Sequence, residues 1–360
     1  MDIKERLAVP GAKTASFLEL IKWVDNVPLD FASNHEPYYR LFFQPDPRPH
    51  GYIHPGTVKS MPWTPVFTVD HPSRAVRLAP KPSDQPASAG DNGDGDVGAD
   101  AVWVTSSLQA CVDAAISADI FPVLNRMHSE PFLLMGVRPS SATTTTAGEP
   151  AAPGASPPPP PPQLERFAAS LFGIATRGSH MTAYVRPSPH CPARDLLIWC
   201  ARRSRHLYSY PGKLDSTVAG GAKSTQTPTQ CIAAEAAEEA SLPAPLVAER
   251  CRPAGVLTLA NANPRTGGFH SEVLYCYDME LPAGVRPAPG DDEVEEFVLM
   301  TCPDVVAAML RGEFKTNVCA VLVDFFVRHG VVTPESEGEG EYAAICARLH
   351  RQLPVPLAPL

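Results

Sequence analysis

A glutamate-rich segment, residues 231–242 (CIAAEAAEEASL), carries the clearest chemistry in the chain. Glu235, Glu238 and Glu239 stand at positions i, i+3 and i+4, so that in a helix their carboxylates project from one face. Like charges at this spacing repel by roughly 0.2–0.5 kcal/mol, and no Lys or Arg lies within the segment to offset them. A hard divalent cation such as Mg²⁺ prefers oxygen ligands and would relieve the repulsion. The spacing indicates a metal site, and the alternative is an Ala-rich helix whose glutamates face water.

The surrounding residues predict a helix that follows a short strand. Strong helix formers fill the segment, and Pro228 precedes a helix expected over about residues 229–241. An apolar face suited to packing on a sheet is formed by Ile232, Ala236 and Ala240. Upstream, residues 217–221 are expected to form a strand that ends in Gly220 and Gly221.

This order of residues resembles the Nudix box, G-x5-E-x7-R-E-U-x-E-E-x-G-U, in which U is an aliphatic residue. Its marked positions are filled here by Gly220, Glu235, Glu238, Glu239 and Leu242. Ser241 stands where the second Gly belongs, and Ala236 is a small substitute for the aliphatic residue. The resemblance implies a hydrolase in which the three glutamates hold Mg²⁺ (or Mn²⁺) and act in catalysis.

Two positions depart from the box. Gln226 stands in place of the first Glu, and Ala234 in place of the Arg. In the family that Arg orients a catalytic glutamate, so its loss bears on the geometry and the rate. Losing both residues together removes opposite charges and leaves neither unbalanced. An enzyme adapted to the loss and a module that binds a diphosphate without cutting it are both compatible with this box.

The wider chain is similar to a fungal and plant branch of Nudix proteins that places an accessory domain before the Nudix domain. The similar phrases are VDNVP (24–28), RPHGYIHP (48–55), MPWTPVFTVD (61–70), HSEPF (128–132), SLFGIATRGSHMTAYVR (170–186), YPGKLDSTVAGG (210–221), GDDEVEEFVLM (290–300), GEFKTNVCAVLVDFFVRHG (312–330) and YAAICARLHR (342–351). In some fungi this pair of domains is fused to thiamine pyrophosphokinase. The resemblance implies removal of the terminal phosphate from thiamine diphosphate or its oxidised oxo- and oxy-forms, to give the monophosphate. Another nucleoside diphosphate derivative is the alternative substrate.

Further carboxylates could complete the metal site. The resemblance implies one more acidic residue after the box, and Glu293 in DDEVEEF is the first choice. Glu295 and Glu296 follow it, and Glu272, beside an expected strand, is a weaker candidate. The alternative for the acidic run is a solvated turn before a strand.

Candidate ligands for the phosphates and the organic group of a substrate lie elsewhere in the chain. Arg202, Arg203 and Lys213 could bind phosphate together with Gly220 and Gly221, because guanidinium groups suit bidentate phosphate contacts. Each of these cations could instead be a solvated surface residue. His128 and His180 are weaker functional candidates. The N-terminal aromatic residues could stack on a heteroaromatic ring or a thiazolium cation, or form a core: Trp23, Tyr38, Tyr39, Tyr52 and Trp63.

The chain is expected to be α+β with two domains. Residues 1–138 form the smaller accessory domain, with a disordered insert at about 81–100. Residues 139–163, rich in Pro, Thr and Ala, form a linker. Strands, one helix, more strands and closing helices over residues 164–352 predict an α/β/α sandwich with a mixed sheet, and 353–360 form a tail. The expected strands cover about 181–186, 196–202, 217–221, 256–259, 273–279 and 296–300, with helices at 107–118, 229–241, 303–311 and 320–329.

Composition narrows the class of partner. A net charge of −9 argues against a general nucleic-acid binder, and no apolar run approaches the length of a membrane span. Nine cysteines without a zinc-like spacing are expected to be reduced thiols, which with a charged N-terminus favours a cytoplasmic protein. The expected partner is a small-molecule diphosphate, and the oligomeric state is left open.

Overall fold

The computed structural model describes residues 16–82, 100–126, 130–138 and 160–360. The expected insert and linker lie almost entirely outside the described residues, as does His128. None of the helices in the described part is both long enough and apolar enough to cross a membrane.

The central element is a seven-stranded mixed sheet of order β11-β12-β7-β8-β13, in which β10 also pairs with β7 and β9 with β8. Its strands are β7 (Ala175–Val185), β8 (Leu197–Arg203), β9 (Leu214–Asp215), β10 (Val218–Gly221), β11 (Arg252–Ala262), β12 (Phe269–Glu280) and β13 (Val294–Thr301). β7 runs parallel to β12 and antiparallel to β8 and β10. The hairpin of two strands expected around residues 181–202 is therefore part of this sheet.

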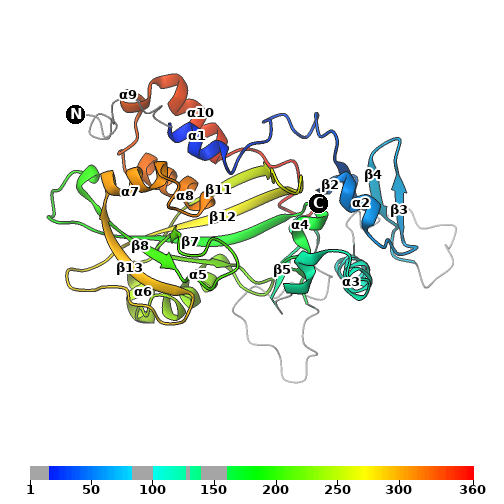
Figure 1. Cartoon of the computed structure of the whole chain (residues 1–360), viewed down its shortest axis with the longest axis horizontal. Helices are drawn as coiled ribbons and strands as arrows, with labels where there is room; N and C mark the ends of the chain where they lie inside the picture. The colour runs from blue at the N-terminus through cyan, green and yellow to red at the C-terminus, as the bar shows by residue number, and fades with distance from the viewer. Residues whose placement is uncertain (1–15, 83–99, 127–129, 139–159) are drawn as a thin grey trace.

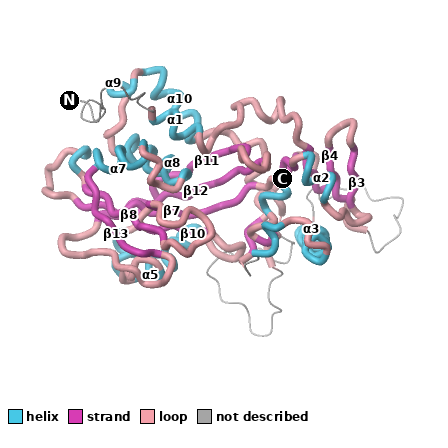
Figure 2. The backbone as a smooth tube through the Cα atoms, viewed as in Figure 1, coloured by secondary structure: helices cyan, strands magenta, loops and turns pink. Residues whose placement is uncertain are grey.

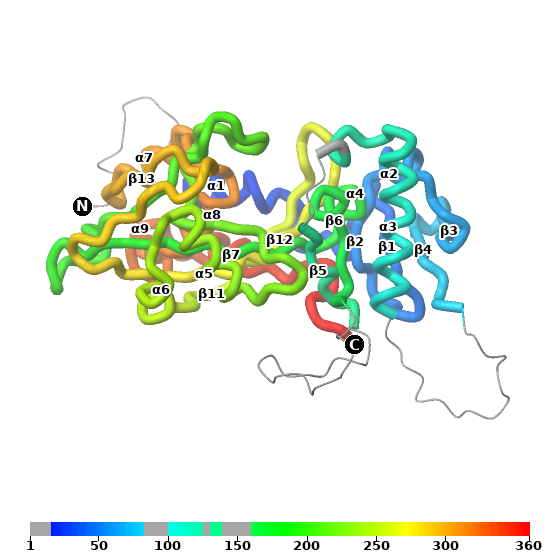
Figure 3. Tube along the Cα trace, turned by 90° about the horizontal axis from the view of Figure 1, so that it is seen from below, coloured from blue at the N-terminus to red at the C-terminus, as the bar shows by residue number. Residues whose placement is uncertain are grey.

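Helices cover both faces of the sheet (Figures 1 and 2). One face carries α1 (Phe17–Lys22), α7 (Cys302–Leu310), α8 (Thr316–Arg328) and α10 (Glu339–Leu349), with α9 (Pro334–Glu337) beside α10. The other carries α5 (Pro228–Glu238) and α6 (Ala244–Arg250), which Figure 3 shows lying across the strands. The predicted α/β/α sandwich with a mixed sheet is confirmed.

Side-chain alternation along the strands divides the core between the two faces. On β12, Leu274 and Cys276 pack toward α7 and α8, whereas Tyr277 and Met279 pack toward α5 and α6. Successive side chains of a strand point to opposite faces, so a strand covered on both sides is apolar on both. β7 departs from this rule, because buried polar side chains interrupt it. They are Thr176, Arg177, Ser179, His180 and Thr182. Buried polar groups need partners, which marks β7 as a strand that serves a site.

A second, four-stranded sheet of order β2-β1-β4-β3 lies beside the sandwich (Figure 3). Its strands are β1 (Tyr39–Phe43), β2 (Pro49–Ile53), β3 (Phe67–Asp70) and β4 (Ala75–Leu78), and its helices are α2 (Pro55–Ser60) and α3 (Ala101–Ser117). Leu164, Ala168 and Phe172 join this second core, the latter two from in and beside α4 (Ala169–Phe172). Conversely, Phe17, Leu20 and Ile21 of α1 join the core of the sandwich.

Chain segments therefore cross between the two cores. β5 (Pro131–Leu133) pairs with β6 (Gln163–Glu165) on the far side of the expected linker. Gly51 of β2 meets Gly173 so closely that a Cβ on Gly51 would lie 2.3 Å from the carbonyl oxygen of Phe172. The division into domains 1–138 and 164–352 stays a prediction, and the contacts show that each part supplies residues to the other's core.

Candidate active site

The acidic helix starts where its sequence requires. Thr227 is the N-cap of α5, and its side-chain oxygen accepts a hydrogen bond from the backbone N–H of Gln230 at 3.1 Å. The Gln230 side chain accepts in return from the N–H of Thr227 at 2.9 Å, which completes a capping box. Pro228 at the first helical position loses no hydrogen bond there. The helix ends at Glu238, three residues before the expected end, and Ser241 beyond it has a φ of +51°.

The strand before α5 approaches the helix at one point. A Cβ built on Gly220 would lie 2.1 Å from Oε1 of Glu235 and 2.5 Å from its Cγ. Any other residue at position 220 would collide with the glutamate. Glycine at position 220 therefore leaves the space that the Glu235 side chain occupies beside β10.

Replacing Gly220 by Ala is expected to displace Glu235 and to lower catalysis about 100-fold, as misplacement of a reacting group by about 1 Å does. The fold should persist, because the φ of Gly220 is one that Ala adopts and the obstructing group is a side chain that can rotate. Phosphate release and the unfolding midpoint would be measured together. Gly255→Ala on β11, whose Cβ meets no atom within 4 Å, is the control and should leave both unchanged.

The acidic face of α5 opens on a cleft of about 400 Å³. Glu235, Glu238 and Glu239 line it, and Glu293 faces them from the segment before β13. Cations from separate elements also line it: Arg166, Arg177, Arg203, Lys223 and Lys315. The cleft thus combines carboxylates that suit a divalent cation with cations that suit phosphate oxygens.

Burial and mutual repulsion act on the carboxylates. Burial, with the charges of Glu238 and Glu293, raises the pKa of Glu235 to about 7. Burial and the charge of Glu235 raise the pKa of Glu239 well above its ordinary value, although the Glu239 carboxylate accepts a hydrogen bond from the N–H of Ala219 at 3.2 Å. The helix face therefore holds more negative charge than its surroundings compensate.

The donor set suits a hard cation by its chemistry. It consists of carboxylate oxygens, which Mg²⁺ and Mn²⁺ prefer, and the pKa values of Glu235 and Glu239 are raised first by burial and then by the repulsion between neighbouring carboxylates, which a cation would offset. Within the described residues, however, no three His, Cys, Asp or Glu side chains are gathered closely enough to hold a metal ion. Glu235, Glu238 and Glu239, which would hold the ion, therefore line the same cleft but do not converge on a single point.

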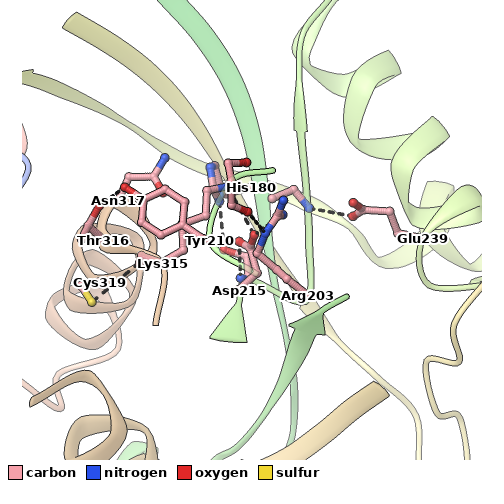
Figure 4. A network of polar contacts seen from close by, with 12 residues as sticks. His180, Arg203, Tyr210, Asp215, Glu239, Lys315, Thr316, Asn317 and Cys319 are labelled. Carbon is pink, nitrogen blue, oxygen red and sulfur yellow. Dashed lines mark hydrogen bonds and ion pairs between the residues drawn. The ribbon is translucent and has the colours of Figure 1, made fainter. Parts of the chain in front are cut away.

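A network of charged residues underlies the opposite wall of the cleft (Figure 4). Asp215 is buried and accepts from Arg203 Nη1 at 3.0 Å and from Lys315 Nζ at 3.3 Å. Nδ1 of His180 lies 2.9 Å from the Ser216 hydroxyl, and burial, followed by the charge of Lys315, lowers the pKa of His180 to about 4. His180 is therefore neutral near pH 7, and the network fixes Arg203 and Lys315 at the cleft.

The chain is similar in sequence to several known proteins. No family model matches the chain. "Uncharacterized protein YJR142W" of Saccharomyces cerevisiae is 32% identical over 202 residues, which cover 54% of this chain and 58% of the yeast protein. "Nudix hydrolase 20, chloroplastic" of Arabidopsis thaliana is 36% identical over 176 residues, 49% of this chain and 45% of the plant protein. The chain is similar to Nudix hydrolases.

The extent of this similarity is limited. The chain spans about half the length of the curated relatives it matches. The solved NUDIX domain of Shewanella oneidensis NrtR, in complex with ADP ribose, is 14% identical, covers 44% of this chain and 90% of that domain, and has a TM-score of 0.33. The cytoplasmic location expected from the sequence stays a prediction.

Of the two departures from the Nudix box, Ala234 lies within α5 and Gln226 lies in the loop before it. Gln226 uses its side-chain oxygen to accept from the N–H of Lys223 at 3.3 Å. Arg177 of β7, which is 8% exposed, donates from Nη2 to the carbonyls of Lys223 (2.7 Å), Ser224 (3.3 Å) and Gln226 (2.8 Å). A guanidinium from the neighbouring strand thus fixes the loop that leads into α5.

The other site residues predicted from the sequence fall into two groups, those that line the cleft and those that do not. Arg203, Gly220, Gly221, Glu272 and His180 line the cleft with the glutamates. Arg202 and Lys213 lie outside its lining: Arg202 pairs with Glu296 at 2.6 Å, and Lys213 Nζ donates to the carbonyl of Gly312 at 2.5 Å. Glu295 pairs with Arg205 at 3.7 Å. Of the N-terminal aromatic residues, Tyr38 and Tyr52 are buried, Tyr39 and Trp63 pack partly buried on the second core, and Trp23 is exposed.

Sequence reasoning missed several lining residues. Arg177 and Lys315 are the clearest, since each is buried or half-buried and reaches the cleft from a different element. Both stand in phrases singled out for their resemblance, SLFGIATRGSHMTAYVR and GEFKTNVCAVLVDFFVRHG. Arg177 precedes the strand expected at residues 181–186 and stands in the polar run TRGSH, so the strand pattern gave no signal for it.

Proposed function

We propose that this protein is a metal-dependent hydrolase of phosphoanhydride bonds in small-molecule diphosphates. The observation that carries the proposal is the convergence of Glu235, Glu238, Glu239 and Glu293 on one cleft whose other wall bears fixed cations. The similarity to plant Nudix hydrolases supports the same class of reaction.

The role proposed for each residue follows from the chemistry of its side chain. Glu235, Glu238 and Glu239 would hold Mg²⁺ (or Mn²⁺), which when bound neutralises phosphate charge and lowers the pKa of an attacking water. Glu293, which lines the same cleft, would accept a proton from that water. Arg203 and Lys315, fixed by Asp215, present cations to the phosphate oxygens, and this prior positioning reduces the cost of ordering them.

The substrate proposed is thiamine diphosphate or its oxidised oxo- and oxy-forms, from which the terminal phosphate is removed to leave the monophosphate. Support comes from the phrases shared with the fungal and plant branch, which occur between residues 24 and 351 on both sides of the two low-complexity segments. Another nucleoside diphosphate derivative is the second candidate of the same chemistry. Binding of a diphosphate without hydrolysis is a third, favoured by Gln226 and Ala234 in the box.

The test is phosphate release from thiamine diphosphate, oxothiamine diphosphate, oxythiamine diphosphate, ADP-ribose and nucleoside diphosphates. We expect release with Mg²⁺, none after EDTA, and the highest kcat/KM on the oxidised thiamine forms. Faster release from ADP-ribose or a nucleoside diphosphate would move the substrate to that class. No release from any compound by the folded protein, together with binding of one of them, would show a binding module.

A further inference from the structure

A second, larger cleft of about 1000 Å³ adjoins the acidic one. The two share part of their lining, namely Ser170, Tyr210, His270, Glu272, Lys315 and Asn317. Lys315 and Tyr210 therefore stand at the junction, and Figure 4 shows them side by side there. A molecule with its phosphates in the acidic cleft would place its organic group in the second one.

The second cleft gathers exposed aromatic side chains. Trp23, Tyr208 and Tyr210 are 46%, 64% and 41% exposed, and they are the exposed aromatic side chains among the residues that the structure describes. All three line this cleft, although Trp23 comes from the end of α1 and the two tyrosines from the segment between β8 and β9. Single exposed apolar residues need no explanation, but their convergence from distant parts of the chain on one cleft indicates a binding surface.

Tyr210 has a backbone conformation that is unfavourable for a bulky residue. Its φ is +51°, in the left-handed region that bulky residues rarely adopt. The Tyr210 hydroxyl lies 2.9 Å from Thr316 Oγ1 at the start of α8, which ties the loop to the helix. Strain of this kind persists where the surrounding structure fixes it, and it gathers at ligand sites.

The junction also holds an unsatisfied acceptor. Oδ1 of Asn317 is buried without a hydrogen-bond partner, while its amide nitrogen lies 3.5 Å from Glu272 Oε2. A buried acceptor of this kind is ordinarily paired, so it suits an O–H or N–H group of a ligand that spans the two clefts. An aliphatic chain would leave it unpaired, whereas a heterocycle or its hydroxylated linker carries such donors.

We infer that the cleft formed by Trp23, Tyr208 and Tyr210 binds an aromatic heterocycle of the substrate, with its phosphates in the acidic cleft and Lys315 between them. The inference rests on the proposed function for the position of the phosphates. Aromatic faces stack on any planar ring and attract a cationic ring further. Trp23 lies in the N-terminal part of the chain, so this part contributes directly to substrate selection.

The test measures binding of compounds that lack the bond to be cut, so that it does not depend on hydrolysis. Thiamine monophosphate and AMP carry a ring, and isopentenyl monophosphate does not. By titration calorimetry we expect the wild-type protein to bind the two ring compounds at least tenfold more tightly, which corresponds to about 1.4 kcal/mol. Trp23→Ala should reduce this preference to within about twofold, and Trp23→Phe should keep most of it.

Leu29→Ala is the matched control, because Leu29 is an exposed apolar residue of the same N-terminal segment outside the cleft lining. It should leave the preference unchanged. Equal binding of all three compounds by the wild-type protein, no measurable binding of a ring compound, or an unchanged preference in Trp23→Ala would each overturn the inference. A preference for ring compounds without any phosphate release would support this inference and refute the proposed hydrolysis. Phosphate release without a preference for ring compounds would support the hydrolysis and refute this inference.

Discussion

Glu238→Gln is expected to lower Mg²⁺-dependent phosphate release by at least about 100-fold, since loss of even an outer partner of a metal ligand costs about 10–100-fold. Glu238 is exposed on the cleft side of α5 and packs in no core, so its replacement should not alter folding. The substitution removes the charge of a proposed metal ligand and keeps the shape of the side chain. Release would be measured with and without Mg²⁺, and Mg²⁺ affinity would be followed by calorimetry.

Glu249→Gln is the control for this experiment. Glu249 is an exposed glutamate of the next helix, α6, whose carboxylate pairs with Arg250 at 3.4 Å and which does not line the cleft. Its replacement should leave release and Mg²⁺ affinity unchanged. If Glu238→Gln kept its activity within a few-fold, the acidic face of α5 would not be the metal site, and the carboxylates Glu272 and Glu293 would become the next to replace.

Asp25→Ala is expected to lower the free energy of unfolding by about 3–5 kcal/mol, the cost of leaving a buried charge unpaired. Asp25 follows α1 and is 0% exposed. Its carboxylate accepts from Arg348 and Arg351, each at 2.8 Å, and from the N–H of Ala260 at 3.0 Å. Arg351 is itself buried, and without Asp25 its guanidinium would lose the carboxylate it pairs with among the described residues.

Urea denaturation of the whole chain measures this loss. Asp30→Ala is the control, because Asp30 is an exposed aspartate of the same segment whose carboxylate accepts a hydrogen bond from the nearby Asn34 side chain at 2.8 Å. It should change the free energy of unfolding by less than about 0.5 kcal/mol. A cost below about 1 kcal/mol for Asp25→Ala would mean that the charges are solvated in solution. Combining it with Arg351→Met would show how much of the loss is due to the stranded guanidinium.

Local patterns predicted most of the sandwich. Strands at residues 181–186 and 196–202, and the helix near residues 229–241, follow from alternation and helix-forming composition, and each is present with shifted ends. α6 and α10 were not predicted. α6 has only seven residues, too few to show a clear period. α10 does carry a local signal, since Tyr342, Ile345, Cys346 and Leu349 stand at the i, i+3, i+4 and i+7 spacing of a helix face, and Ile345 and Leu349 are buried in the sandwich core.

Arg202 and Arg203 are adjacent in the sequence, but only Arg203 lines the cleft. Arg202 and Arg203 are both candidates by type, but neighbouring side chains on a strand point to opposite faces. Arg203 therefore reaches the cleft and Asp215, while Arg202 pairs with Glu296 on β13. The register of β8 in the sheet decides which arginine points toward the cleft. The residue types alone do not reveal this register.

The sequence by itself determined the acidic helix, because the i, i+3, i+4 spacing, the proline start and the capping box are local properties of residues 227–239. It also determined the sandwich class through the order of strands and helices. Only the tertiary structure decided which cations face those glutamates, since Arg177, Arg203 and Lys315 come from three separate elements. It alone brought Trp23 to the same cleft as Tyr208 and Tyr210, because segments so far apart in the chain can line one cleft only once α1 packs on the finished sheet.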